Sequence, residues 1–164
     1  MEPFRATLCT EMKNKNLITF ALVAIALVGC STPQMKGTWR SSLKLTQEFN
    51  LKNAILEQKT TEFLNQIIGH TTIKYKKDTF TISDSDREII VEGGPSSWDG
   101  INQTWQYNIL AQNEQKIVME ATDPTERLHI ITLHFINEDT YWVYLGSTKE
   151  FEHLNIREYF ARVE

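Results

Sequence analysis

From residue 71 onward, apolar and polar residues alternate with a period of two, and turn residues interrupt the pattern at short intervals. Successive side chains of a β-strand point to opposite faces, so this alternation predicts strands that are buried on one face. Strands are expected at residues 71–76, 79–83, 87–92, 103–110, 116–121, 127–135, 140–145 and 156–163, and residues 93–100 are expected to form a loop. The short connections favour antiparallel neighbours, because parallel crossovers need about a dozen residues.

The region before residue 71 is expected to contain one short strand, at residues 38–40, followed by two helices. Leu45 and Phe49 stand four residues apart, which favours a helix at 42–50. Apolar side chains form one stripe over residues 57–68, which predicts a second helix. A sheet of this kind can hide its edges by closing. We therefore expect a mainly β fold: an antiparallel up-and-down barrel of about eight to nine strands, with a helix pair between the first and second strands.

Residues 12–30, MKNKNLITFALVAIALVGC, have the organisation of an export signal. Lys13 and Lys15 are basic, and the apolar run that follows is too short to span a bilayer, which takes about 20 residues. The segment resembles a bacterial lipoprotein signal, whose lipobox ends in a cysteine that is acylated. The resemblance implies cleavage before Cys30 and a palmitate-type lipid anchor on that residue. Lipoproteins retained in the inner membrane usually carry Asp at the next position, so Ser31 implies the inner leaflet of the outer membrane, facing the periplasm.

These features divide the chain into four segments. Residues 1–11 are interpreted as an extension before the true start at Met12, because Glu2 and Glu11 are unusual in a positively charged signal; a start at Met1 is the alternative. Residues 12–29 are the expected signal peptide, and residues 30–36 the expected lipidated tether. Residues 37–164 are then expected to form a single barrel domain.

Composition argues against several classes of function. Removing residues 1–29 shifts the formal net charge from -4 to about -5, which is unfavourable for nucleic-acid binding. The exported chain would keep only Cys30, so no internal disulfide is expected. The chain has four histidines that lack the spacing of a zinc site: His70, His129, His134 and His153. It contains no motif of a catalytic nucleophile and no phosphate-binding loop. We therefore expect no catalytic residue, no metal and no cofactor, and we expect that the protein is not an enzyme.

The order of elements resembles the calycin group, which comprises the lipocalins and the fatty-acid-binding proteins. The resemblance lies in Gly37-Thr38-Trp39, a helix pair, and hairpin-connected strands ending in residues 156–163. The sequences GTWRS and REYF are also similar to those that open and close short bacterial lipoproteins with lipocalin-like domains. The resemblance implies that Trp39 closes one end of the barrel and packs on a basic side chain of the last strand, either Arg157 or Arg162. It also implies that the helix pair gates the barrel.

Arg157 and Tyr159 are two residues apart on the last expected strand, so they share a face. In fatty-acid-binding proteins an Arg-x-Tyr pair inside the barrel holds the ligand head group, and the resemblance implies that role here, with a carboxylate as the chemical match. The alternative interpretation makes Arg157 the partner of Trp39 and Tyr159 a core residue. Phe160 lies on the opposite face and would point outward if Tyr159 points inward.

Two functions are therefore expected from different classes. The first is a membrane-anchored periplasmic lipoprotein that binds a small hydrophobic or amphipathic ligand inside its barrel. The alternative is a non-catalytic envelope interaction factor, such as an inhibitor, immunity or assembly accessory protein, with a filled barrel. In that case Trp98, in its Gly-, Pro- and Ser-rich segment, would contact the protein partner. A cavity in the barrel discriminates between the two.

Overall fold

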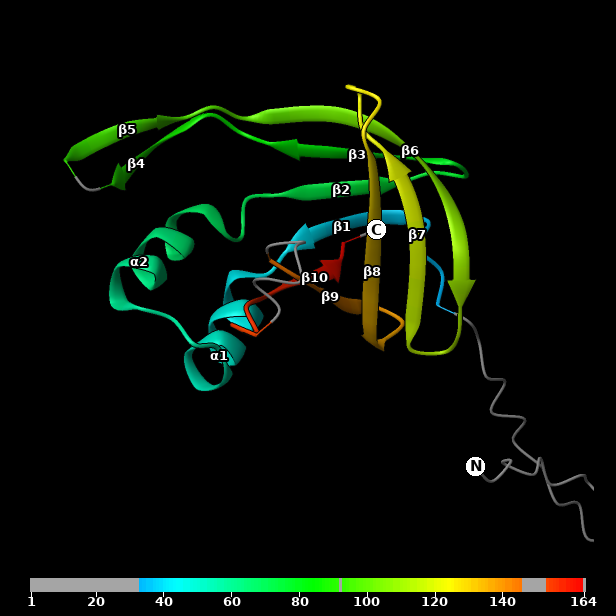
Figure 1. Cartoon of the computed structure of the whole chain (residues 1–164), viewed down its shortest axis with the longest axis horizontal. Helices are drawn as coiled ribbons and strands as arrows, with labels where there is room; N and C mark the ends of the chain where they lie inside the picture. Colours follow the sequence, from blue (N-terminus) through cyan, green and yellow to red (C-terminus); the bar gives the residue numbers. More distant parts are fainter. Residues whose placement is uncertain (1–32, 92, 146–152, 164) are drawn as a thin grey trace, which may run out of the picture.

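The computed structural model describes residues 33–91, 93–145 and 153–163 (Figure 1). Two helices and ten strands are found in these ranges. In chain order they are β1 (Gly37–Ser41), α1 (Leu43–Asn53), α2 (Gln58–Ile67), β2 (Thr72–Tyr75), β3 (Thr79–Asp84), β4 (Arg87–Val91), β5 (Gly94–Trp98), β6 (Ile101–Gln112), β7 (Lys116–Thr122), β8 (Leu128–Asn137), β9 (Thr140–Tyr144) and β10 (Arg157–Arg162). Within the described ranges, neither helix is long and apolar enough to cross a membrane.

Eight of the strands form a closed antiparallel barrel in the order β1-β10-β9-β8-β7-β6-β3-β2. The barrel closes because β1 pairs with the last strand on one side and with β2 on the other. Strands that are adjacent in the barrel are also consecutive in the chain, except that β3 pairs with β6 and β1 pairs with β10. The predicted mainly β class, the antiparallel barrel and the helix pair after the first strand are confirmed.

The β4–β5 hairpin is the main departure from the expected strands. Residues 94–98, expected to lie in a loop, form β5 and pair with β4 from Trp98↔Arg87 to Gly94↔Val91. The two strands form a sheet of their own outside the barrel and extend the β3–β6 hairpin into an arm that passes over α2 (Figure 1). Pro95 has no backbone N–H, which is tolerated in such a ribbon because β5 has only one ladder partner. Gly93 and Gly94 have φ values of 107° and 120°, which favour glycine at this turn.

Aromatic and aliphatic side chains pack around Trp39 in the interior of the barrel. Trp39, Ile117, Met119, Leu133 and Tyr141 are almost completely buried. The Tyr141 ring lies 4.8 Å from the Trp39 ring and 5.1 Å from the Phe160 ring, measured between centroids. Burial of large aromatic rings is the main stabilising contribution available to a chain whose described part contains no disulfide.

Residues 33–36, which precede β1, cross one end of this barrel, which we call the closed end. Met35 is only 5% exposed, and its carbonyl oxygen accepts a 2.7 Å hydrogen bond from Trp39 Nε1. Gln112 donates to the carbonyl of Pro33 at 2.8 Å, and Arg162 donates to the carbonyl of Lys36 at 2.7 Å. The expected tether is therefore part of the folded domain from Pro33 onward, because its backbone carbonyls accept hydrogen bonds from the barrel.

Helix α1 completes the β-ladder at the other end of the barrel. β1 pairs with β10 only from residue 160 onward, so the backbone of Arg157 and Tyr159 has a free edge there. Thr46 Oγ1 accepts from Tyr159 N–H at 2.9 Å. Asn50 accepts from Arg157 N–H at 3.0 Å and donates to the Arg157 carbonyl at 2.8 Å. These bonds explain why two polar residues, one turn apart, form the buried face of α1.

Asn50→Ala is expected to lower the free energy of unfolding by about 2 kcal/mol, because it leaves a partly buried N–H and a partly buried C=O of Arg157 without their partner. Asn53→Ala on the same helix is the matched control, since that side chain is exposed and bonds only within α1. Its expected loss is below about 0.5 kcal/mol. Urea unfolding followed by circular dichroism measures both, and equal losses would contradict the edge-capping role of Asn50.

Candidate ligand-binding site

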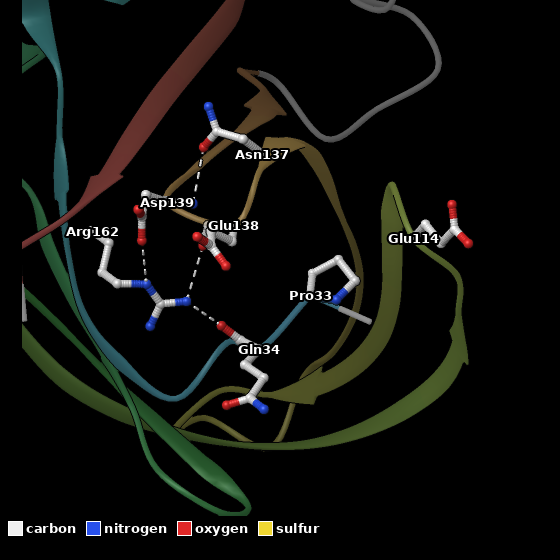
Figure 2. A pocket seen from close by; sticks show the side chains of 7 residues that line it. All are labelled: Pro33, Gln34, Glu114, Asn137, Glu138, Asp139 and Arg162. Carbon is white, nitrogen blue, oxygen red and sulfur yellow. Dashed lines mark hydrogen bonds and ion pairs between the residues drawn. The ribbon is translucent and has the colours of Figure 1, made fainter. Parts of the chain in front are cut away.

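Arg162 is the basic side chain that stacks on Trp39. Its guanidinium carbon lies 4.3 Å from the centre of the Trp39 ring, and it also pairs with Asp139 at 3.1 Å. Figure 2 shows the Arg162 guanidinium held between Gln34, Glu138 and Asp139 at the closed end. Of the two candidates left open by the sequence, the structure therefore places Arg162, and not Arg157, on the tryptophan.

The Arg157–Tyr159 pair does not line the barrel interior. Trp39 is opposite Arg162 in the β1–β10 ladder, so the even-numbered residues of β10 share the inner face. Arg157 lies outside, 4.1 Å from the ring centre of Phe49 on α1 and 3.7 Å from that of Trp142. The Tyr159 ring packs on Phe49 at 5.7 Å. The expectation that this pair holds a ligand head group inside the barrel is wrong, because the register turns both side chains toward α1.

The barrel interior is hollow near the end opposite residues 33–36, which we call the mouth. A cavity of about 340 Å³ lies between β2, β3, β8, β9 and β10. Its walls are mainly aliphatic and aromatic, and it is lined by Thr71, Ile73, Tyr75, Phe80, Ile82, Ile130, Ile131, Thr132, Leu133, Tyr141, Val143, Tyr144, Glu158 and Phe160. Cavities of this size and chemistry are typical of sites for small apolar molecules.

Glu158 is the one residue with a formal charge among the described residues that line this cavity. Its Oε1 accepts a 2.6 Å hydrogen bond from the Ser41 hydroxyl, which in turn accepts from Gly69 N–H at 2.9 Å. Glu158 is 9% exposed, and burial raises the pKa of its carboxyl to about 7, while the hydrogen bond from Ser41 works in the opposite direction. An ionisable carboxyl group therefore stands in an apolar wall.

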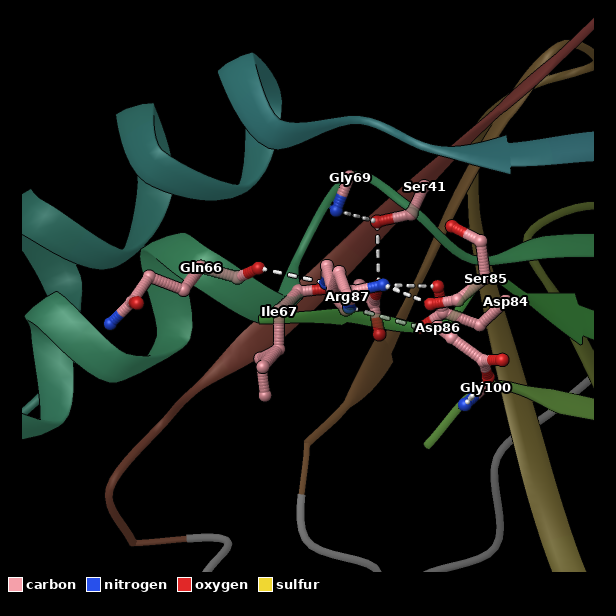
Figure 3. Close-up of polar contacts among 10 residues, drawn as sticks. Ser41, Gln66, Ile67, Gly69, Asp84, Ser85, Asp86, Arg87 and Gly100 are labelled. Atoms are coloured by element: carbon pink, nitrogen blue, oxygen red, sulfur yellow. Dashed lines mark hydrogen bonds and ion pairs between the residues drawn. The ribbon is translucent and has the colours of Figure 1, made fainter. Parts of the chain in front are cut away.

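A second acidic residue supports the mouth from outside the cavity. Asp84, at the end of β3, pairs with the Arg87 guanidinium through two contacts of 2.5 and 3.2 Å. This arginine also donates to the carbonyls of Gln66 and Ile67, at 3.3 and 3.2 Å, and so caps the C-terminal end of α2. Figure 3 shows Arg87 between α2 and the Asp84 turn. The pKa of Asp84 is lowered because Arg87 stabilises the carboxylate, although burial opposes the effect.

Two buried tyrosines contribute further polar groups to the cavity wall. The hydroxyl oxygens of Tyr75 and Tyr141 are 3.4 Å apart, and both side chains are buried. Burial raises the pKa of both phenols well above their usual value, so they remain neutral hydrogen-bonding groups.

Trp98, which the alternative function would place against a protein partner, is half-buried and contacts α2 and Arg87. Its ring lies 6.3 Å from that of Phe63 on α2, and the Arg87 guanidinium carbon is 5.4 Å from its centre. Gln66 fixes the same arm to α2, donating to the Ile90 carbonyl at 3.0 Å and accepting from Ile90 N–H at 2.6 Å. The exposed large apolar residues of the arm are Ile90 and Val91.

Two histidines, His134 and His129, contact neighbouring side chains on the barrel. His134 stacks on Trp142 with 3.9 Å between centroids, and burial lowers its pKa to about 4. His129 contacts Asp123 at 3.0 Å. Across the ranges that the structure describes, no three His, Cys, Asp or Glu side chains come together as a metal site would require.

Glu158 was missed by sequence reasoning although a signal for it existed. A pairing of Trp39 with Arg162 implies that Glu158 and Phe160 share the inner face, because residues two apart point the same way. The Arg-x-Tyr spacing favoured the opposite face.

Cys30 lies outside the described residues. No protein family, curated protein sequence or solved structure matches this chain.

Proposed function

We propose that this chain is a lipid-anchored protein of the bacterial envelope whose barrel binds a small apolar or amphipathic ligand. The observation that carries the proposal is the cavity of about 340 Å³ at the barrel mouth, with walls that are mainly apolar. Eight-stranded barrels can be filled by side chains or can hold one small ligand, and the cavity favours the second function here. The proposal describes a binding protein of the lipocalin-like kind, without catalysis.

Filling the cavity provides the test. Val143→Phe adds a ring to the cavity wall, whereas Val91→Phe makes the same change on the exposed part of β4. The full chain is purified in lipid nanodiscs, extracted with organic solvent and analysed by mass spectrometry. We expect a bound apolar compound with the unchanged chain and with Val91→Phe, and its loss with Val143→Phe. Equal extracts from both variants, together with no binding of a neutral fluorescent apolar probe, would contradict the proposal.

The lipid anchor is the second part of the proposal, and the packing of residues 33–36 gives it a geometric consequence. Pro33 is hydrogen-bonded to the closed end of the barrel through Gln112. An extended chain spans at most about 3.5 Å per residue, so Cys30 would lie within about 10 Å of that end. A lipid on Cys30 would hold the closed end against the membrane and turn the mouth away from it.

Two measurements on the full chain test this part. Labelled palmitate is expected on the unchanged chain and not on Cys30→Ala. A fluorophore attached at Glu114, in the β6–β7 turn of the closed end, is expected to be quenched by spin-labelled lipid head groups. The same fluorophore at Ser97 on the β5 arm is expected to escape quenching. Label retained by Cys30→Ala would overturn the anchor, and equal quenching at both sites would overturn the orientation.

The alternative, an interaction factor, is favoured by one observation. A groove between α2 and the tip of the arm is lined by Phe63, Gln66, Ile90 and Val91, together with three polar residues of α2. Exposed apolar residues at such a place are suited to a protein contact. Trp98 lies on the same arm, half-buried and in contact with Phe63 and Arg87.

A further inference from the structure

The placement of Glu158 bears on the chemical class of the ligand. A carboxyl group buried in an apolar wall is costly to ionise unless a donor or a cation approaches it. Among the described residues, only the Ser41 hydroxyl donates to this carboxyl, at 2.6 Å. That hydroxyl has a single proton to give, and Gly69 N–H already occupies one of its acceptor positions. A carboxylate has room for further donors, and a ligand in the cavity could supply one.

The charges around the mouth favour a cation. Asp84 on β3 faces Glu158 closely enough to make its ionisation harder, and Arg87 on β4 is paired with Asp84. The other polar residues that line the cavity or bond to Glu158 are uncharged: Ser41, Thr71, Tyr75, Thr132, Tyr141 and Tyr144. Glu158, Asp84 and Arg87 together therefore contribute two carboxyl groups and one guanidinium. A second carboxylate brought by a ligand would be repelled, whereas an ammonium group would be attracted.

We infer that the cavity takes an amphipathic molecule with a protonated amine at its polar end, and that Glu158 pairs with this amine while the apolar body lies between β3 and β8. This inference rests on the proposed binding function and specifies its ligand class. The Arg-x-Tyr spacing suggested a ligand with an acidic head group. The inference reverses that chemistry, because Glu158 faces the cavity and Arg157 does not. Ion pairs with hydrogen bonds in such surroundings are strong, because little water competes for them.

A matched ligand series tests the inference. Hexylamine, hexanol and hexanoate have the same apolar body and differ in the head group. Each is titrated calorimetrically into the full chain in lipid nanodiscs at pH 8, and empty nanodiscs correct for partitioning into lipid. Hexylamine is expected to bind at least about tenfold more tightly than hexanol, with hexanoate weakest. In Glu158→Gln the hexylamine affinity is expected to fall about tenfold, and hexanol is expected to be unaffected.

The pH dependence of the unchanged chain provides a readout that needs no variant. Between pH 6 and pH 8 the hexylamine affinity is expected to rise, because Glu158 ionises, while the hexanol affinity stays constant. Hexanoate binding as tightly as hexylamine, equal binding of hexanol and hexylamine, or a flat pH profile for hexylamine would each overturn the inference. If none of the three binds while an apolar compound is still extracted from the chain, the proposed function stands and the amine specificity falls.

Discussion

Trp39→Ala is expected to lower the free energy of unfolding by about 4 kcal/mol, the largest single effect foreseen for this chain. The Trp39 side chain is completely buried and its ring contacts that of Tyr141 at 4.8 Å. Its Nε1 donates to the Met35 carbonyl at 2.7 Å, and Arg162 stacks on its ring at 4.3 Å. Removing the ring therefore opens a void in the core and releases both residues 33–36 and Arg162 at the closed end.

Urea unfolding followed by far-UV circular dichroism measures this loss. Trp98→Ala is the matched control, because it removes the same ring from the β4–β5 arm, where Trp98 is only half-buried. Its expected cost is below about 2 kcal/mol. Trp39→Phe keeps an aromatic ring and loses the hydrogen bond to Met35, so it is expected to fall between the two. Equal costs for Trp39→Ala and Trp98→Ala would show that the closed end contributes no more than the arm.

Glu158→Gln is expected to make the protein more stable at pH 8, by up to about 3 kcal/mol. The folded-state pKa of Glu158 is raised from 4.5 to about 7, chiefly by burial. The folded state therefore holds more protons than the unfolded state between these values, and stability falls as the pH rises from about 4.5 to about 7. Above that window the loss is complete. Glutamine remains neutral and still offers an oxygen to the Ser41 hydroxyl, so the variant avoids the loss.

The measurement compares urea unfolding of the unchanged chain and Glu158→Gln at pH 4.5, 6 and 8. The two stabilities are expected to be similar at pH 4.5 and to diverge as the pH rises. Glu88→Gln removes an acidic group from an exposed position on β4 and serves as the charge control. A Glu158→Gln variant that is less stable than the unchanged chain at pH 8 would indicate that the ionised carboxylate is stabilised by the fold rather than tolerated by it.

Much of the architecture could be predicted because its signals are local. The period of two along β7, β8 and β9 follows from strands with one wet face, and the short turns force antiparallel neighbours. The helix pair was visible from apolar spacing, and α1 and α2 are found within a few residues of the expected bounds. The core position of Trp39 was expected only from the resemblance carried by Gly37-Thr38-Trp39.

Other features had no local signal. Residues 94–98 include Gly, Pro and Ser, which have low β propensity, and they form a strand because β4 supplies a ladder partner. Residues 33–36 have no apolar pattern, yet their carbonyls are bound by side chains distant in sequence, such as Gln112 and Arg162. Asn50 and Thr46 are polar, and their burial depends on the free edge of β10.

The alternation along the last strand already separates two faces, one with Arg157 and Tyr159 and the other with Glu158 and Phe160. Which of these faces points into the barrel follows from strand pairing. The period of two is the same for both choices, whereas the register of β10 on β1 admits only one, with Arg162 opposite Trp39. A shift of one residue would exchange the faces, so the chemistry of the cavity wall depends on how the first and last strands pair.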